Sequence, residues 1–109
     1  MKTIKKIPIE YEFFEGERPY YDDMEQNIIY VSKETSQAFH VCLCGCKNPV
    51  VMALDSIDVN GEITEGKWPG KNWNLSIKGE KATFSPSIGN YSYKCQSHYI
   101  ITNSIANFV

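Results

Sequence analysis

The stretch His40-Val-Cys-Leu-Cys-Gly-Cys46 and the shorter stretch Cys95-Gln-Ser-His98 contain all four cysteines and both histidines of a chain of 109 residues. Thiolates and imidazoles suit zinc, which binds four ligands in a tetrahedron. Three cysteines spread along one flat strand would be too far apart to share an ion, so the backbone has to turn. Gly45 permits that turn because glycine reaches positive φ without steric cost. The two stretches therefore predict one metal site that joins distant parts of the chain and closes a long loop.

Two ligand sets satisfy this pattern. In the first, zinc is held by Cys42, Cys44, Cys46 and Cys95, which leaves His98 free. In the second, two cysteines of the first stretch act together with Cys95 and His98, and one thiol is spare. We favour the four-cysteine set, which is a common closed arrangement for structural zinc.

Disulfide bridges and free buried thiols are the alternatives to a metal. The N-terminal residues MKTIKKIPIEYEFF contain neither the apolar segment nor the cleavage site of a secretory signal. An oxidising compartment is therefore not indicated, and we expect a cytoplasmic protein. Bridges between cysteines that are two positions apart would also close small, strained rings.

The bulk composition limits the classes of partner. At this length we expect one domain spanning residues 1–109. The formal net charge is -2 and the 11 lysines and arginines are scattered, so nucleic acid is not an expected partner. No run of about twenty apolar residues is present, so no membrane span is predicted. The sequence does not indicate an oligomeric state.

Short β-branched and aromatic runs, with turn signals every ten residues or so, predict an all-β fold. We expect a small antiparallel sheet or sandwich of hairpins, with one zinc site and little or no helix. The runs are residues 4–14, 27–32, 37–42, 48–54, 73–77, 81–84, 99–102 and 105–108, with a further pair on either side of residues 60–61. Pro8 places the first run at a sheet edge or makes it irregular, and Asn60-Gly61 is typical of a two-residue hairpin turn.

His40 and the pair Asp22-Asp23 are better explained without a functional role. His40 lies two positions before Cys42 and shares its strand face, so it is either a spare ligand, a catalytic group or, as we favour, a plain strand histidine. The pair Asp22-Asp23 is better explained as solvated loop carboxylates than as a metal or acid-base group.

A second stretch that could take part in catalysis is Thr83-Phe-Ser-Pro-Ser-Ile-Gly-Asn90. A serine becomes a nucleophile when a base accepts its proton and N–H donors stabilise the oxyanion. His98 can be the base for Ser87 if sulfur alone holds the zinc, and the backbone near Gly89 would supply the donors. The same residue types are common in any tight loop, so this stretch alone does not establish catalysis.

Taken in order, several short motifs resemble the small bacterial family DUF6527, with coverage from about residue 24 to 108. They are Tyr30-Val-Ser32, His40-x-Cys-x-Cys-Gly-Cys46, Trp73-x-Leu75, Thr83-x-x-Pro-Ser-Ile-Gly-Asn90 and Cys95-x-Ser-His-Tyr-x-Ile101. Some members of that family sit in operons with ubiquitin-like proteins and with E1- and E2-like enzymes. The resemblance implies a metal-binding domain and, in the operon-linked members, a peptidase that trims or removes the ubiquitin-like protein.

The resemblance also matches individual residues of this chain to positions of the family pattern. It places Cys42, Cys44, Cys46, Cys95 and His98 at the cysteine and histidine positions of the family, and Ser87 at the serine of its PSIGN block. The chain departs from the family pattern at Lys47, where a glycine commonly follows the third cysteine. It also has a longer insert at about residues 55–71, and we expect no fused conjugation domain.

The leading hypothesis is therefore a zinc-containing β domain that hydrolyses the C-terminal tail of a ubiquitin-like protein or its conjugates. Ser87 is the expected nucleophile and His98 its base, while the zinc is structural. A metal-dependent mechanism would need an open coordination position and a carboxylate base such as Asp55 or Asp58. No HExxH-type signature supports it, so we favour the serine-type enzyme.

The alternative is a non-catalytic, zinc-stapled protein-interaction module. Aromatic side chains concentrate at interfaces. In this alternative the candidate anchors for the partner protein are Trp68, Trp73, Tyr91 and Tyr93, although the same four residues fit positions in the core equally well.

Overall fold

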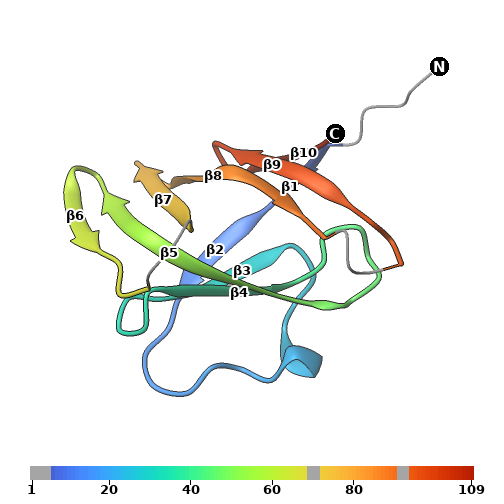
Figure 1. Ribbon diagram of the computed structural model, residues 1–109, viewed down its shortest axis with the longest axis horizontal. Helices are drawn as coiled ribbons and strands as arrows, with labels where there is room; N and C mark the ends of the chain where they lie inside the picture. The colour runs from blue at the N-terminus through green and yellow to red at the C-terminus, as the bar shows by residue number, and fades with distance from the viewer. Residues whose placement is uncertain (1–5, 69–71, 91–93) are drawn as a thin grey trace.

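The computed structural model describes residues 6–68, 72–90 and 94–109. This part of the chain forms ten β-strands and one turn of 3-10 helix, η1 (Tyr21–Asp23), which confirms the predicted all-β class (Figure 1). The strands are β1 (Lys6–Pro8), β2 (Glu10–Phe13), β3 (Ile28–Ser32), β4 (Gln37–Val41), β5 (Pro49–Val59), β6 (Glu62–Glu65), β7 (Trp73–Lys78), β8 (Lys81–Gly89), β9 (His98–Thr102) and β10 (Ile105–Phe108). Across these ranges, no helix is long and apolar enough to cross a membrane.

The strands form a single sheet that nearly closes on itself. β1 and β2 lie at its two ends, yet Ile9 alone separates them in the chain, because β1 pairs with β10 and β2 pairs with β3. The backbone N–H groups of Ile9 and Glu10 donate to the carbonyl oxygens of Ser104 and Asn27, at 2.9 Å each. The first strand segment therefore joins the two ends of the sheet into a barrel-like shape and covers edges that would otherwise be open.

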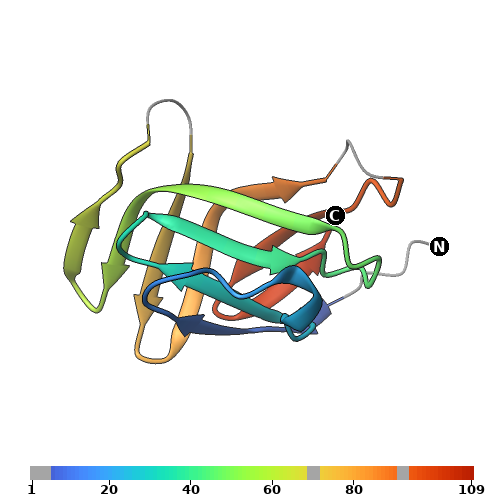
Figure 2. The same cartoon turned by 90° about the horizontal axis from the view of Figure 1, so that it is seen from below.

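β5 is shared between the two halves of the sheet. Its first half pairs with β4, and its second half pairs with β6 on one side and β7 on the other. Figures 1 and 2 show it running diagonally from the layer of β2, β3 and β4 toward the layer of β7 to β10. The long apolar run that follows the cysteines in the sequence thus connects the two layers.

The sheet is mixed, whereas the hairpin pattern predicted antiparallel pairing. β2 pairs with β3 in parallel, and so does β5 with β7. Parallel neighbours need a crossover connection, and a sequence pattern that pairs consecutive runs does not reveal one. The predicted hairpin turns are present, since Asn60, Gly61, Asn103 and Ser104 all have the positive φ that such turns require.

The main core lies between the two layers. Its largest fully buried side chains are Ile29, Leu43, Met52, Leu54, Ile57, Leu75, Ile77, Phe84, Ile88, Tyr99 and Ile101. A smaller cluster of Met24, Tyr30, Phe39 and Val41 lies on the other face of β3 and β4, and Phe14 and Tyr21 pack against it. β3 and β4 are therefore buried on both faces, which explains why their sequences are almost continuously apolar.

The topology brings the two cysteine-containing segments to the same end of the molecule. The first connects β4 to β5, and the second connects β8 to β9. In Figure 1 the green β4–β5 turn lies beside the orange and red ends of β8 and β9. Contacts between Cys42, Cys46 and Cys95 join the two segments.

Candidate active site and metal centre

The β4–β5 connection is a tight turn that begins at Cys42. The N–H of Cys42 donates to the carbonyl of Asn48 at 2.8 Å, and the N–H of Gly45 donates to the carbonyl of Cys42 at 3.2 Å. Gly45 has a φ of 99° and Lys47 a φ of 63°. The prediction that Gly45 allows the backbone to turn is therefore confirmed, and Lys47 adopts a left-handed conformation that glycine accepts more readily.

The turn gathers the cysteine sulfurs around a common centre. The Sγ of Cys42 lies 3.4 Å from that of Cys44 and 3.8 Å from that of Cys95, which in turn lies 3.6 Å from Cys46. All four sulfurs lie within 4.8 Å of one another. In a tetrahedral site with metal–sulfur bonds of about 2.3 Å, the sulfurs stand about 3.8 Å apart. The group can therefore hold a metal ion, and its cysteines are all free rather than bridged.

Amide groups donate to these sulfurs, as expected around thiolates that bind a metal. The Nδ2 of Asn48 lies 3.3 Å from the Sγ of Cys46, and the Nδ2 of Asn90 lies 3.4 Å from the Sγ of Cys42. The backbone N–H of Cys46 donates to the Sγ of Cys44 at 3.4 Å. These donors favour negatively charged sulfur and so agree with a cation at the centre of the group.

The thiols differ in how easily they lose a proton. Burial raises the pKa of the Cys42 thiol and raises the pKa of Cys44 to about 12. Hydrogen bonds from Ser97 lower the pKa of Cys95 to about 6. Because metal ligands must be deprotonated, binding of a metal by this group would release protons.

The imidazole of His98 contacts Ser87. Its Nε2 lies 2.6 Å from the Oγ of Ser87, and both side chains are half-buried. His98 is the first residue of β9, and Ser87 lies near the end of β8. The structure thus brings together the two residues that the sequence predicts as nucleophile and base, with geometry suited to proton transfer.

A bulge in β8 produces this contact. Phe84 pairs with Ile101 and Ile88 pairs with Tyr99, so the three residues from 85 to 87 oppose a single residue of β9. Bulges of this kind redirect side chains, and they are common beside active sites. The stretch that resembled a tight loop is therefore an interrupted strand.

The register also explains why His98 can reach Ser87. Ile88 and Tyr99 are buried in the core, so the neighbouring Ser87, Gly89 and His98 project from the opposite face of the sheet. Gly89 pairs directly with His98. Because Gly89 has no side chain, the imidazole can extend diagonally toward the hydroxyl of Ser87.

Trp73 holds the bulge from the neighbouring strand. Its indole Nε1 donates to the carbonyl oxygen of Ser87 at 3.2 Å, and its ring packs against the main core. The sequence leaves Trp73 as either an anchor for a partner protein or a core residue. Its contacts agree with a core residue, and they tie the serine-bearing segment to β7.

A buried polar network lies beneath the cysteine group. His40 Nε2 lies 2.7 Å from the Oη of Tyr99, and burial lowers the pKa of His40 to about 3. The Nδ2 of Asn90 lies 3.3 Å from the same Oη and 3.2 Å from the Oγ of Ser97, which is 3.0 Å from the Sγ of Cys42. His40 is thus a neutral core histidine, in agreement with the favoured interpretation of the sequence.

The sequence did not single out Asn90, Ser97 or Tyr99 as functional. Asn90 ends the PSIGN block, and Ser97 and Tyr99 flank His98. The sequence clue to a function for these three residues was that they lie beside predicted site residues such as His98. The contacts between them depend on a strand pairing that no local pattern encodes.

The remaining candidates lie elsewhere. Asp55 accepts a hydrogen bond from Asn72, and Asp58 accepts one from the backbone N–H of Gly61. Trp68 is 43% exposed and donates from its indole to the carbonyl of Thr35. Asp22 and Asp23 are exposed carboxylates in η1. Tyr91 and Tyr93 lie outside the described residues.

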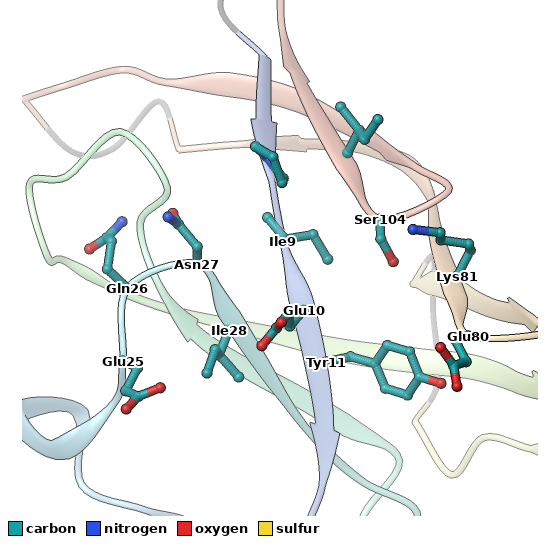
Figure 3. A pocket seen from close by; sticks show the side chains of 12 residues that line it. Ile9, Glu10, Tyr11, Glu25, Gln26, Asn27, Ile28, Glu80, Lys81 and Ser104 are labelled. Atoms are coloured by element: carbon teal, nitrogen blue, oxygen red, sulfur yellow. The ribbon is translucent and has the colours of Figure 1, made fainter.

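A cleft of about 880 Å³ lies where β2 and β3 begin near the β7–β8 and β9–β10 turns. Figure 3 shows Glu10, Glu25 and Glu80 along it, together with Lys81. None of the predicted nucleophile, base or cysteine residues lines this cleft. The Ser87–His98 pair and the cysteine group therefore lie outside this cleft.

A family model described as "Bacterial ubiquitination-like system serine protease (BubE)" matches residues 14–109. No curated protein and no solved structure matches the chain. The matched range includes every cysteine and histidine and also Ser87. The match agrees with the predicted ubiquitin-like pathway, whereas the family name DUF6527 stays a prediction.

Proposed function

The chain belongs to the BubE family of serine proteases from bacterial ubiquitination-like systems, and we propose that it cleaves the bond that follows the C-terminus of a ubiquitin-like protein. The substrate is a precursor with a C-terminal extension or a conjugate of the processed protein. The observation that carries this proposal is the 2.6 Å separation between Ser87 Oγ and His98 Nε2. A neutral imidazole at that distance can accept the serine proton.

In the proposed reaction, His98 Nε2 takes the proton of Ser87 as Oγ attacks the scissile carbonyl carbon. The tetrahedral intermediate collapses when protonated His98 gives that proton to the leaving amine, which leaves an acyl group on Ser87. His98 then accepts a proton from water, whose oxygen attacks the acyl carbon. Collapse returns the proton to Ser87 and releases the new carboxylate.

The proposed ligands of zinc are Cys42, Cys44, Cys46 and Cys95. The S–S separations and the N–H donors around the sulfurs fit a closed site of four thiolates. A bound zinc would supply a cross-link between the β4–β5 turn and the segment that leads into β9. That segment ends at His98, so the cross-link supports the position of the proposed base.

Cleavage of a linear fusion tests the proposal. The substrate is a ubiquitin-like protein with a short C-terminal extension, and the products are identified by intact mass. We expect cleavage by the wild type and none by Ser87→Ala or His98→Ala at the same enzyme concentration. The matched control is Ser85→Ala, which removes the other hydroxyl of the bulge and should keep its activity.

The same experiment separates the enzyme from a non-catalytic interaction module. A binding module would retain the fusion without cutting it. Cleavage by Ser87→Ala at the wild-type rate would show that Ser87 is not the nucleophile and would overturn the proposed mechanism.

A further inference from the structure

Asn90 occupies a central position between the cysteine group and β9. It follows β8 directly, is 6% exposed, and its backbone N–H donates to the carbonyl of Ser97 at 2.7 Å. Its side-chain Nδ2 lies within hydrogen-bond distance of Cys42 Sγ, Ser97 Oγ and Tyr99 Oη, at 3.4, 3.2 and 3.3 Å. A single buried amide therefore shares its two N–H donors among three acceptors.

Two of those acceptors belong to the residues on either side of His98. Side chains alternate along a strand, so Ser97 and Tyr99 face inward while His98 faces outward. Fixing both inward side chains fixes the backbone at His98 and the direction of its Cα–Cβ bond. A misplacement of about 1 Å at a reacting group can cost a hundredfold in rate.

The third acceptor is a sulfur of the cysteine group. The Cys42 sulfur also lies 3.0 Å from the Oγ of Ser97. When Cys42 is a thiolate, as a metal ligand must be, the hydrogen bonds that it accepts become charge-assisted and stronger.

We propose that Asn90 is a positioning residue that couples the cysteine centre to the imidazole of His98, an inference that rests on the proposed serine mechanism. Asn90 does not touch the reacting atoms. Its hydrogen bonds link the metal-bound cysteine group to Ser97 and Tyr99, the two neighbours of His98. Metal binding thereby aligns the base with Ser87. Occupancy of the cysteine centre thereby regulates the reaction without taking part in it.

The test compares Asn90→Ala with the matched control Asn48→Ala. Asn48 also donates an amide N–H to a cysteine sulfur, Cys46 Sγ at 3.3 Å, but it lies on the β4–β5 connection and not beside His98. Both variants remove one N–H···S hydrogen bond from the cysteine group. The conservative variant Asn90→Ser keeps one donor, and it reports on the proposal if Asn90→Ala does not fold.

The first readout is the cleavage of the fusion substrate by zinc-loaded proteins. We expect Asn90→Ala to keep its zinc stoichiometry and KM while kcat falls about 10- to 100-fold, the range seen for residues that support metal ligands. Asn90→Ser should fall between Asn90→Ala and the wild type. Asn48→Ala should lose less of its kcat than Asn90→Ala, because Asn48 contacts neither neighbour of His98.

The second readout does not depend on protease activity. The chain has two histidines, so the ring signals of His98 are readily assigned by NMR. We expect these signals to shift in Asn90→Ala and to match the wild type in Asn48→Ala. If the wild type cleaves no fusion, the proposed function fails, and the ring signals still decide whether the coupling exists.

Unchanged His98 signals in Asn90→Ala would overturn the inference, as would an unchanged kcat in an active wild-type background. An equal loss in Asn48→Ala would also overturn it, because the effect would then come from the weakened cysteine group in general.

Discussion

Ser87 and His98 stand diagonally across the β8–β9 pair, 2.6 Å apart at Oγ and Nε2, although their positions in the chain differ by 11. Their contact depends on the bulge at residues 85–87 and on Gly89, which pairs with His98 and has no side chain. A local feature of the strand pairing therefore creates the geometry of the proposed active site.

Replacing His98 with glutamine should remove the base while leaving the fold and the metal content intact. General-base catalysis contributes about 100- to 10,000-fold, so we expect kcat on the fusion substrate to fall by that amount. Zinc stoichiometry should not change, because the proposed ligands are the four cysteines and not His98. Thr102→Ala, an exposed change at the other end of β9, is the control. Loss of zinc in His98→Gln would instead identify His98 as a ligand.

Trp73→Phe should affect stability and activity together. It removes the indole N–H that donates to the carbonyl of Ser87 but keeps an aromatic ring in the core. Loss of this hydrogen bond should cost about 0.5–1.5 kcal/mol in the free energy of unfolding. Because the bulge loses an anchor, kcat should also fall, and both quantities are measured by denaturant unfolding and the cleavage assay.

Trp68→Phe is the control for that experiment. It removes a comparable indole hydrogen bond, to Thr35, at a site away from the bulge. We expect a similar or smaller loss of stability with no change in kcat. Equal loss of activity in both variants would mean that Trp73 does not act through Ser87.

Chelation of the metal, or the substitution Cys95→Ala, should destabilise the whole domain. Structural zinc contributes about 10–16 kcal/mol to the folding of small zinc-finger peptides, whereas a domain is typically stable by about 5–15 kcal/mol. We expect a large drop in melting temperature, measured by circular dichroism before and after a strong chelator. A melting temperature that is independent of chelator would argue against a metal in this group.

Much of the fold was predictable because it depends on local patterns. The all-β class, the hairpins and the turns at Asn60-Gly61 and Asn103-Ser104 follow from alternation and turn chemistry, and each is present. The gathering of the four cysteines was predictable for a different reason, since soft ligands concentrated in two short stretches have few other uses.

The remaining features depend on long-range pairing. The parallel pairs β2–β3 and β5–β7, and the closure of the sheet at Ile9, require knowledge of which distant strands meet. The hydrogen bonds of Asn90 could not be predicted either, because polar residues in a short motif look the same whether they face solvent or a buried sulfur. Only the folded register places Asn90 between Cys42 and Tyr99.

The closure of the sheet gives a prediction about stability. Ile9 is 4% exposed at the junction of β1 and β2 and packs in the main core. Ile9→Ala should lower the free energy of unfolding by about 2–5 kcal/mol, as is typical for a buried isoleucine. The control Ile63→Ala, at a position that is 66% exposed on β6, should change it by less than about 0.5 kcal/mol. Equal effects in urea unfolding would contradict the described closure.

The role of Ser87 as the nucleophile is tested most directly with a fluorophosphonate, a probe that modifies activated serines. The measurement is the site at which the probe reacts. Peptide mapping by mass spectrometry locates the adduct after the zinc-loaded protein is incubated with the probe. We expect one adduct on Ser87, absent in Ser87→Ala and formed far more slowly in His98→Gln. If a protein that cleaves the fusion substrate carries no adduct on Ser87, or carries it on another residue, then Ser87 is not the nucleophile.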